Sequence, residues 1–307
     1  MKDLKLSNFK GKFISRTSHW GLTGKKLRYF ITIASMTGFS LFGYDQGLMA
    51  SLITGKQFNY EFPATKENGD HDRHATVVQG ATTSCYELGC FAGSLFVMFC
   101  GERIGRKPLI LMGSVITIIG AVISTCAFRG YWALGQFIIG RVVTGVGTGL
   151  NTSTIPVWQS EMSKAENRGL LVNLEGSTIA FGTMIAYWID FGFSYTNSSV
   201  QWRFPVSMQI VFAFFLLAFM IKLPESPRWL ISQSRTEEAR YLVGTLDDAD
   251  PNDEEVITEV AMLHDAVNRT KHEKHSLSSL FSRGRSQNLQ RALIAASTQF
   301  FQQFTGC

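Results

Sequence analysis

The stretch that decides the fold is "ITIASMTGFSLFGYDQGLMASLI", residues 31–53, which is predominantly apolar but carries one acid, Asp45. It is long enough to cross a bilayer, because a spanning helix needs about 20 apolar residues. A charge near the middle of a membrane costs roughly 2.5 kcal/mol or more. The segment therefore predicts a membrane helix with a carboxylate whose presence has to be explained.

Further apolar segments of similar length follow the first one along the chain. The 307 residues have a mean hydropathy of only +0.07, because long apolar runs are averaged with polar tails. A seventh apolar segment begins at Arg291 and is cut off at Cys307. The pattern predicts an all-α membrane protein with helices near 29–53, 76–100, 108–128, 132–157, 170–193 and 204–223.

Lysine and arginine predict the orientation, since short cytoplasmic loops carry the excess of these residues. The segments "GERIGRKP" and "SKAENRG" are basic, whereas the loops at 129–131 and 194–203 carry one arginine each. The N-terminal tail is the most basic part of the chain, which places it in the cytoplasm. Its cationic residues are Lys2, Lys5, Lys10, Lys12, Arg16, Lys25, Lys26 and Arg28.

Composition also divides the chain into segments. The segment between the two groups of spans is too charged for lipid, and Thr236 and Asn252 are expected to cap short amphipathic helices within it. We predict a basic cytoplasmic arm at 1–28, a six-span bundle at 29–223, a cytoplasmic helical linker at 224–290 and the start of a truncated seventh span at 291–307.

Glycines indicate an internal repeat of three plus three spans. The first and fourth spans, which begin the two triplets, are both rich in glycine. Transporters built from repeats place interrupted helices at matching positions in each repeat. Gly145 and Gly149, like Gly89 and Gly93, are four residues apart, a spacing that lets helix backbones approach closely.

Two opposite charges inside the spans are expected at the same depth. Asp45 lies about eight residues from the outer end of its span, roughly 12 Å down, and Arg141 lies about nine residues from the outer start of its own, roughly 13 Å down. The pair is either a static salt bridge or part of a proton path, and buried ionisable groups in membrane spans favour the second. Glu87 and Glu175 are further acids inside predicted spans.

Other motifs carry little functional information. The five cysteines lie in predicted spans, which argues against a disulfide framework, and the histidine pairs in "HDRH" and "KHEKH" lack a third metal ligand. Asn197 in "NSS" is a glycosylation acceptor on the expected outer side. No residues support an enzyme, a cofactor, a metal site or nucleic-acid binding.

Several motifs, in order and spacing, resemble the N-terminal half of a sugar porter of the major facilitator superfamily. These are "LFGYDQG", "GERIGRKP", "GRVVTGVGTG", "PVWQSEMSKAENRG", "LPESPRWL" and "QFFQQFTGC". The resemblance covers about residues 29–307. It implies the major facilitator fold, with the seventh span truncated.

The resemblance also implies roles for individual residues. Asp45 matches the proton acceptor of proton-coupled members, and Arg141 matches its partner. Gln299, Gln302 and Gln303 match glutamines that bind substrate hydroxyls, which suits amides because they both donate and accept hydrogen bonds. A charge network that holds the two halves together on the cytoplasmic side matches Glu102, Arg103, Arg106, Glu161, Arg168, Glu225 and Arg228.

Two departures from the family pattern matter, the first for the cytoplasmic charge network and the second for the substrate. Glu102 stands where aspartate is usual, and Gly176, beside Glu175, stands where hexose carriers usually have a glutamine. The stretches "LVNLEGSTIAFGTMIAYWIDFG" and "WRFPVSMQ" look most like fungal sugar-transporter-like carriers, a group that includes glycerol–proton symporters. We therefore expect proton symport of a sugar or polyol in a multi-pass membrane protein, with a uniporter or a non-transporting nutrient sensor as the alternatives.

Overall fold

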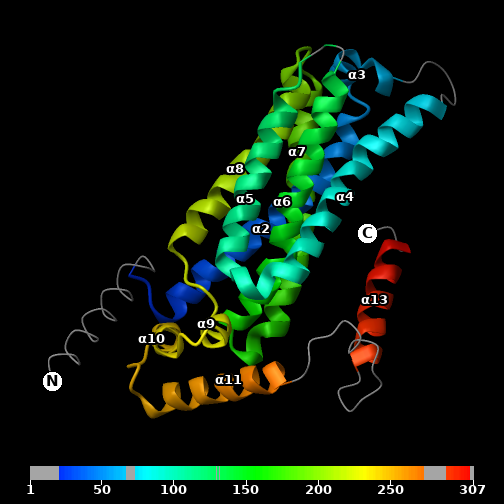
Figure 1. Cartoon of the computed structure of the whole chain (residues 1–307). Helices are drawn as coiled ribbons and strands as arrows, with labels where there is room; N and C mark the ends of the chain where they lie inside the picture. Colours follow the sequence, from blue (N-terminus) through cyan, green and yellow to red (C-terminus); the bar gives the residue numbers. More distant parts are fainter. Residues whose placement is uncertain (1–20, 67–72, 129, 131, 273–287, 305–307) are drawn as a thin grey trace. The chain divides into compact units, whose positions relative to one another are not determined.

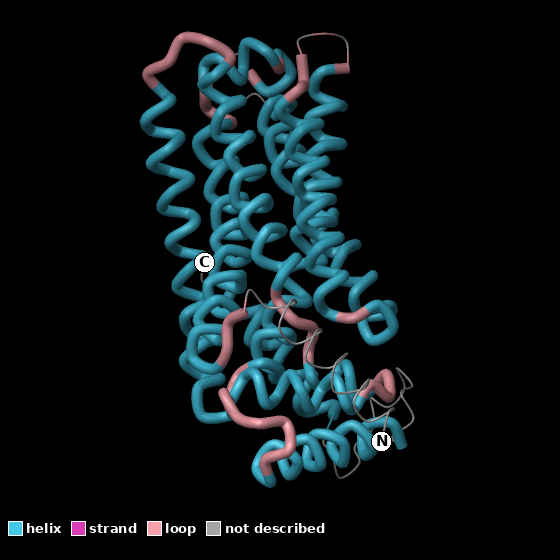
Figure 2. Tube along the Cα trace, turned by 90° about the vertical axis from the view of Figure 1, so that its left-hand side faces the viewer, coloured by secondary structure: helices cyan, strands magenta, loops and turns pink. Residues whose placement is uncertain are grey.

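The computed structural model describes residues 21–66, 73–128, 130, 132–272 and 288–304. These residues form helices joined by loops, with no strand among them (Figure 2). Contacts divide the chain into two compact units, Met1–Val260 and Ala261–Cys307. The second unit contains the end of α11 (Glu254–His272) and the amphipathic helix α13 (Asn288–Phe304).

The first unit is a bundle of long helices with shorter helices at both ends (Figure 1). We call its two ends the α3 end and the α9 end. The long helices are α2 (Gly24–Leu52), α4 (Arg73–Ile104), α5 (Arg106–Thr125), α6 (Ala133–Met162), α7 (Arg168–Ser194) and α8 (Val200–Lys222). The short elements are α3 (Lys56–Glu61), the 3-10 turns η1 (Pro63–Thr65) and η2 (Ala165–Asn167), α9 (Pro227–Ser232) and α10 (Thr236–Asp247).

The six predicted spans coincide with the six long helices. Five of these, α4 to α8, are long and apolar enough to cross a membrane by length and composition. The remaining helix, α2, has 29 residues, but Asp45, Gln46 and several small polar residues lower its mean hydropathy. The all-α prediction is confirmed.

The first helix of each triplet packs mainly against the helices of the other triplet. In the first triplet, α2 packs against α7 and α8 of the second, and in the second triplet α6 packs against α4 and α5 of the first. The pattern is the three-plus-three repeat expected from the glycines. Since α2 and α6 hold equivalent positions, Asp45 and Arg141 come from equivalent helices.

Glycines allow the helix backbones to approach closely where the two triplets pack against each other. A Cβ atom on Gly145 or Gly149 of α6 would collide with the backbone carbonyl oxygens of Tyr86 and Cys90 on α4. In the equivalent contact between α2 and α7, a Cβ atom on Gly43 would collide with the carbonyl of Ile179. Backbone approach of this kind is how small residues join membrane helices.

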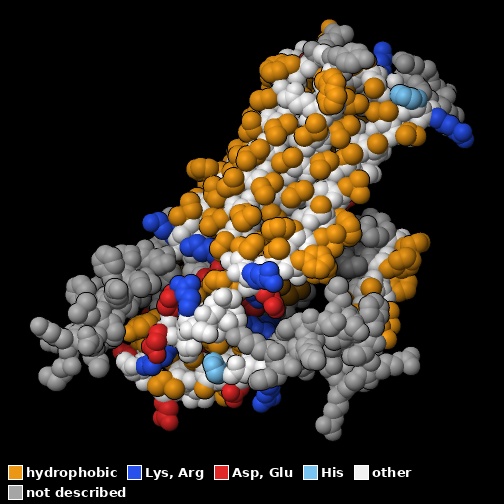
Figure 3. Space-filling model, in the orientation of Figure 1, with side chains coloured by type: hydrophobic (Ala, Val, Ile, Leu, Met, Phe, Trp, Pro, Cys, Tyr) orange, Lys and Arg blue, Asp and Glu red, His pale blue; other side chains and the backbone are white. Residues whose placement is uncertain are grey.

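The surface of the bundle separates apolar from charged side chains. Hydrophobic side chains cover its long flank, while lysine, arginine, aspartate and glutamate gather at the α9 end (Figure 3). At the α3 end, Phe58, Phe62, Phe137 and Trp202 form an aromatic cluster with ring centroids 4.7–6.1 Å apart. The surface therefore suits a bilayer around the flank and water at the charged end.

Some local predictions were wrong by small margins. Helix α10 begins at Thr236 itself, so its cap position is Arg235, and α11 begins at Glu254, two residues after Asn252. Helix α9 was not predicted, and Ser226 caps it by accepting a hydrogen bond from the Trp229 backbone N–H at 3.3 Å.

Candidate functional site

Asp45 and Arg141 meet in the interior of the bundle. Asp45 is 1% exposed and Arg141 is 2% exposed, and Arg141 Nη1 lies 3.7 Å from Asp45 Oδ1. The Tyr86 hydroxyl donates to Asp45 Oδ2 at 3.3 Å, and the Arg141 guanidinium lies 4.5 Å from the centroid of the Tyr86 ring. Three helices thus bring an acid, a base and a phenol together where the matching depths placed the two charges.

The pair is attracted but not fully hydrogen-bonded. At 3.7 Å the contact is longer than a hydrogen bond, and Asp45 Oδ1 has no hydrogen-bond partner among the described residues. Arg141 Nε and Nη1 likewise have none. Because a buried charge needs both a counter-charge and hydrogen bonds, this arrangement leaves the carboxylate able to accept a proton in place of part of its ion pair.

A second polar pair lies next to Asp45 on an exposed face. Gln46 Nε2 donates to Glu87 Oε1 at 2.6 Å, which joins α2 to α4. Both side chains are exposed in this chain, in contrast to the buried pair beside them. Glu87, one of the acids noticed in the predicted spans, is therefore hydrogen-bonded and on the face of the bundle rather than in its core.

The predicted substrate position on α7 has open space around it. Glu175 is 6% exposed, and its carboxylate forms no hydrogen bond or ion pair with the described residues. A Cβ added to the adjacent Gly176 would have none of their heavy atoms within 4 Å. Packing thus does not require a glycine at this position. The other predicted substrate residues, Gln299, Gln302 and Gln303, belong to α13, and their side chains lie outside the described residues.

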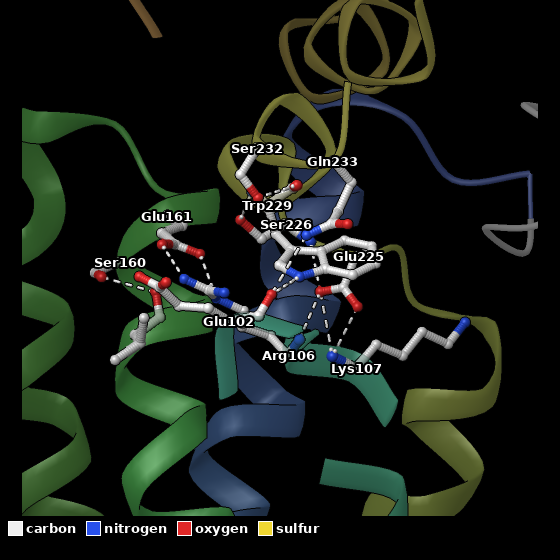
Figure 4. Close-up of polar contacts among 11 residues, drawn as sticks. Glu102, Arg106, Lys107, Ser160, Glu161, Glu225, Ser226, Trp229, Ser232 and Gln233 are labelled. Carbon is white, nitrogen blue, oxygen red and sulfur yellow. Dashed lines mark hydrogen bonds and ion pairs between the residues drawn. The ribbon is translucent and has the colours of Figure 1, made fainter. Parts of the chain in front are cut away.

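The charged network at the α9 end is built around the turn between α4 and α5 (Figure 4). Arg106 forms a two-bonded ion pair with Glu161 at the end of α6, with N–O distances of 3.1 and 3.2 Å. Glu225 accepts hydrogen bonds from the backbone N–H groups of Arg106, Lys107 and Ser226 at 2.9–3.2 Å. Burial raises the pKa of Glu225, and these hydrogen bonds oppose that rise.

Gly105 allows this turn to be tight. Its φ of +100° lies in the region that favours glycine, and a Cβ atom there would lie 2.8 Å from Glu225 Oε2. The turn therefore aims two successive N–H groups at one carboxylate. A glycine at this position is required both by the backbone conformation and by the approach of Glu225.

The structure brings together only part of the predicted network. Arg168 Nε donates to the backbone carbonyl of Ser160 at 3.1 Å rather than to an acid. Glu102 takes part through its backbone carbonyl, which accepts from Trp229 Nε1 at 2.9 Å. Arg103 and Arg228 are exposed, and their side chains form no hydrogen bond or ion pair with the other described residues. Sequence reasoning missed Lys107 and Trp229, although both lie within the quoted motifs.

A second charged cluster ties α10 to the bundle. Asp247 accepts from Arg28 of α2 at 2.6 Å and from Lys164 of the loop before α7 at 2.8 Å. Burial raises the pKa of Asp247, but the hydrogen bond from Lys164 and the two positive charges lower it by more. Burial, together with the nearby Asp247 charge, raises the pKa of Glu259. Sequence spacing gave no signal for this contact, because its members are up to 219 residues apart.

Comparison with known proteins identifies the family. The model of the family described as "Sugar (and other) transporter" matches residues 30–307. The chain belongs to this sugar transporter family. This family consists of multi-pass membrane transporters of the major facilitator superfamily and not of enzymes.

Relatives within the sugar transporter family are longer than this chain. It is 99% identical over all 307 residues to "Sugar transporter STL1" of Saccharomyces cerevisiae, and covers 54% of that protein. It is 48% identical over 295 residues to "Major facilitator superfamily transporter mfsA" of Aspergillus fumigatus, with 95% of this chain and 54% of the relative covered. The chain thus spans about half the length of these relatives.

A solved structure has the same fold. The proton:xylose symporter XylE, bound to 6-bromo-6-deoxy-D-glucose, superposes with a TM-score of 0.73 at 22% identity. The match covers 83% of this chain and 56% of XylE. The likeness confirms the major facilitator fold predicted for the bundle.

Proposed function

We propose that the protein moves a sugar or polyol across a membrane by alternating access, driven by a proton that binds Asp45. The observation that carries the proposal is the buried Asp45–Arg141 pair, held at 3.7 Å, in which one carboxylate oxygen accepts no hydrogen bond from the described residues. Ionisable groups inside membrane spans commonly mark proton or ion paths.

The chemistry follows from the charge balance of the pair. With Asp45 ionised, Arg141 neutralises it inside the bundle, and each offsets the other's loss of hydration. A proton on Asp45 removes the negative charge and weakens its hold on Arg141. A neutral acid costs less free energy than a charged one in an intermediate from which water is excluded. Protonation would therefore favour the conformational change that exposes the site to the other side of the membrane.

A small or unusual hydroxylated solute fits better than a hexose. Gly176 removes a hydrogen-bonding side chain at the position where the resemblance expects glutamine, and no atom of the described residues lies within 4 Å of a Cβ added there. Glutamines 299, 302 and 303 would supply amide donors and acceptors from the seventh span. A polyol needs fewer simultaneous contacts than a ring sugar, which agrees with a site that has lost one.

The charged network would control access from the α9 end. We place this end and the N-terminus on the cytoplasmic side of the plasma membrane. Arg106, Glu161 and Glu225 form its core. Glu102, Arg103, Arg168 and Arg228 would complete it in the state in which this end is closed. The exposed positions of Arg103 and Arg228 leave them available for contacts outside the described bundle.

The test uses the full-length gene product in transporter-deficient cells. Addition of glycerol, another polyol or a hexose should alkalinise the medium if solute enters with protons, and Asp45→Asn should abolish both this signal and uphill accumulation while sparing some downhill exchange. The control Asp265→Asn, an exposed acid on α11, should change neither. Uphill uptake retained by Asp45→Asn would contradict the proposal.

The same assay separates the alternatives. A uniporter, with Asp45 and Arg141 as a permanent pair, would give uptake that does not depend on pH and no alkalinisation. A nutrient sensor would reach the cell surface and give no uptake of any solute.

A further inference from the structure

A pocket at the α3 end of the bundle lies apart from the Asp45–Arg141 pair. It has a volume of about 460 Å³ and is formed by the end of α2, the loop and helix that follow it, the end of α7 and the start of α8. This size is within the range of small-molecule sites, about 300–1,000 Å³. Ser51, which lines it, lies six residues beyond Asp45, or roughly 9 Å farther along α2.

A buried acid lines this pocket. Asp190 is 6% exposed, and the hydroxyl of Ser51 donates to its Oδ2 atom. Its Oδ1 atom has no hydrogen-bond partner, and no lysine, arginine or histidine lies within 4 Å in the part of the chain that the structure describes. A buried carboxylate oxygen without a partner is unfavourable, so a ligand that donates a hydrogen bond would be stabilised there.

A buried donor without a partner lines the same pocket. The Trp202 side chain is fully buried in the aromatic cluster, and its indole N–H has no acceptor among the described residues. Next to it, the Gln201 amide is fixed: it donates to the carbonyl of Ser194 at 2.9 Å and accepts from the N–H of Gln57 at 3.0 Å. The residues that line the pocket thus include an acceptor and a donor that both lack a partner among the described residues.

Aromatic side chains and one lysine also line the pocket. Tyr187 and Phe191 of α7 present exposed rings to the pocket. Asp190 disfavours an anion, and Lys56, which also lines the pocket, disfavours a cation. A neutral molecule with several hydroxyl groups satisfies the acceptor and the donor together, and its C–H faces can pack on the rings.

We propose that this pocket is a second binding site, at the outer end of the bundle, for the same small polyhydroxylated solute that the protein transports. Asp190 Oδ1 would accept from one solute hydroxyl, and the Trp202 indole N–H would donate to another. The ligand class rests on the proposed function, but the site stands on its own geometry. Its role is to hold solute at the outer end before the solute reaches the central path.

Binding is tested without transport by thiol labelling. Intact cells that express the full-length protein with Ser51→Cys, Cys126→Ser and Asp45→Asn are treated with a membrane-impermeant maleimide. Glycerol, another polyol or a hexose should slow the labelling in a saturable manner. Exposed Cys126, in protein that keeps Ser51, is the matched control and should react at an unchanged rate. Labelling of Ser51→Cys that no solute slows would overturn the proposal, whatever the outcome for proton coupling.

Transport kinetics give a second, directional readout. Asp190→Asn should raise the external concentration for half-maximal uptake by about threefold to tenfold, the loss expected for one hydrogen bond. It should leave the internal half-saturating concentration for efflux and the proton-to-solute ratio unchanged. Glu61→Gln, a change at the same end but outside the pocket, should have no effect. Equal changes for uptake and efflux, or no change, would contradict a site at the outer end.

Discussion

At the scale of single residues, glycines with similar sequence surroundings have different tasks. An added Cβ on Gly182 of α7 would collide with the backbone carbonyl of Ser40, so this glycine is required by the contact between α7 and α2. Gly176, on the same helix, has no neighbour within 4 Å. A side chain at Gly176 would therefore change the surface that we propose faces the solute, without changing the packing of the bundle.

This difference predicts a change of substrate preference. Gly176→Gln should leave the amount of protein in the membrane unchanged and raise hexose uptake relative to polyol uptake, because the amide restores a donor and an acceptor. Competition between labelled glucose and labelled glycerol measures the ratio. Gly182→Gln is the matched control and should prevent folding. An unchanged ratio in a well-expressed Gly176→Gln protein would show that this position does not contact the solute.

At the scale of elements, ion pairs rather than apolar packing alone fix α10 to the bundle. Asp247 joins α10 to Arg28 of α2 and to Lys164 before α7. Its pKa is lowered in the folded protein, so it binds a proton less readily folded than unfolded. The stabilisation is therefore fully present above the usual aspartate pKa of 3.8 and is lost as the pH falls through the lower, folded value.

We expect Asp247→Asn to lower the melting temperature of the purified protein at pH 7 by a few degrees. Partly exposed ion pairs stabilise by up to about 1 kcal/mol each, which corresponds to roughly 2–4 °C in a domain of this size. Thermal scans at decreasing pH should show the two proteins converging below pH 3.8. Asp265→Asn serves as the control. A difference that persisted at low pH would assign the effect to something other than the charge of Asp247.

Sequence predicted the elements better than their contacts. Hydropathy located all six long helices, and equal depth placed Asp45 opposite Arg141, because both arguments depend on the regular rise of a helix. The Gln46–Glu87 bond, the Asp247 cluster and the pocket around Asp190 were not predicted. Each joins residues that are far apart in the chain, and which faces meet depends on the exchange of helices between triplets.

At the scale of the whole molecule, charge and apolar surface support the proposal that the α9 end faces the cytoplasm. The basic residues gather at the α9 end (Figure 3). The exposed residue Asn197 lies at the other end, where it lines a pocket together with Lys56 and Phe58 of α3. If the α3 end is outside, Asn197 in "NSS" is open to glycosylation. The Asn197→Gln protein should then migrate faster in gel electrophoresis, as should the enzymatically deglycosylated wild type. Asn268→Gln, in a segment that we place in the cytoplasm, is the control and should not change migration. A change in the migration of this variant would indicate the opposite orientation.

The exchange of helices also sets an order on biosynthesis. The partners of α2 lie in α7 and α8, more than a hundred residues farther along the chain, so α2 enters the membrane well before the helices that cover it are made. During that interval Asp45 has no Arg141 beside it, and the small polar face of α2 has no neighbour from the second triplet. The newly inserted first triplet therefore cannot settle into its final packing. We expect it to remain with the insertion machinery until the second triplet arrives, so that the six helices are completed together.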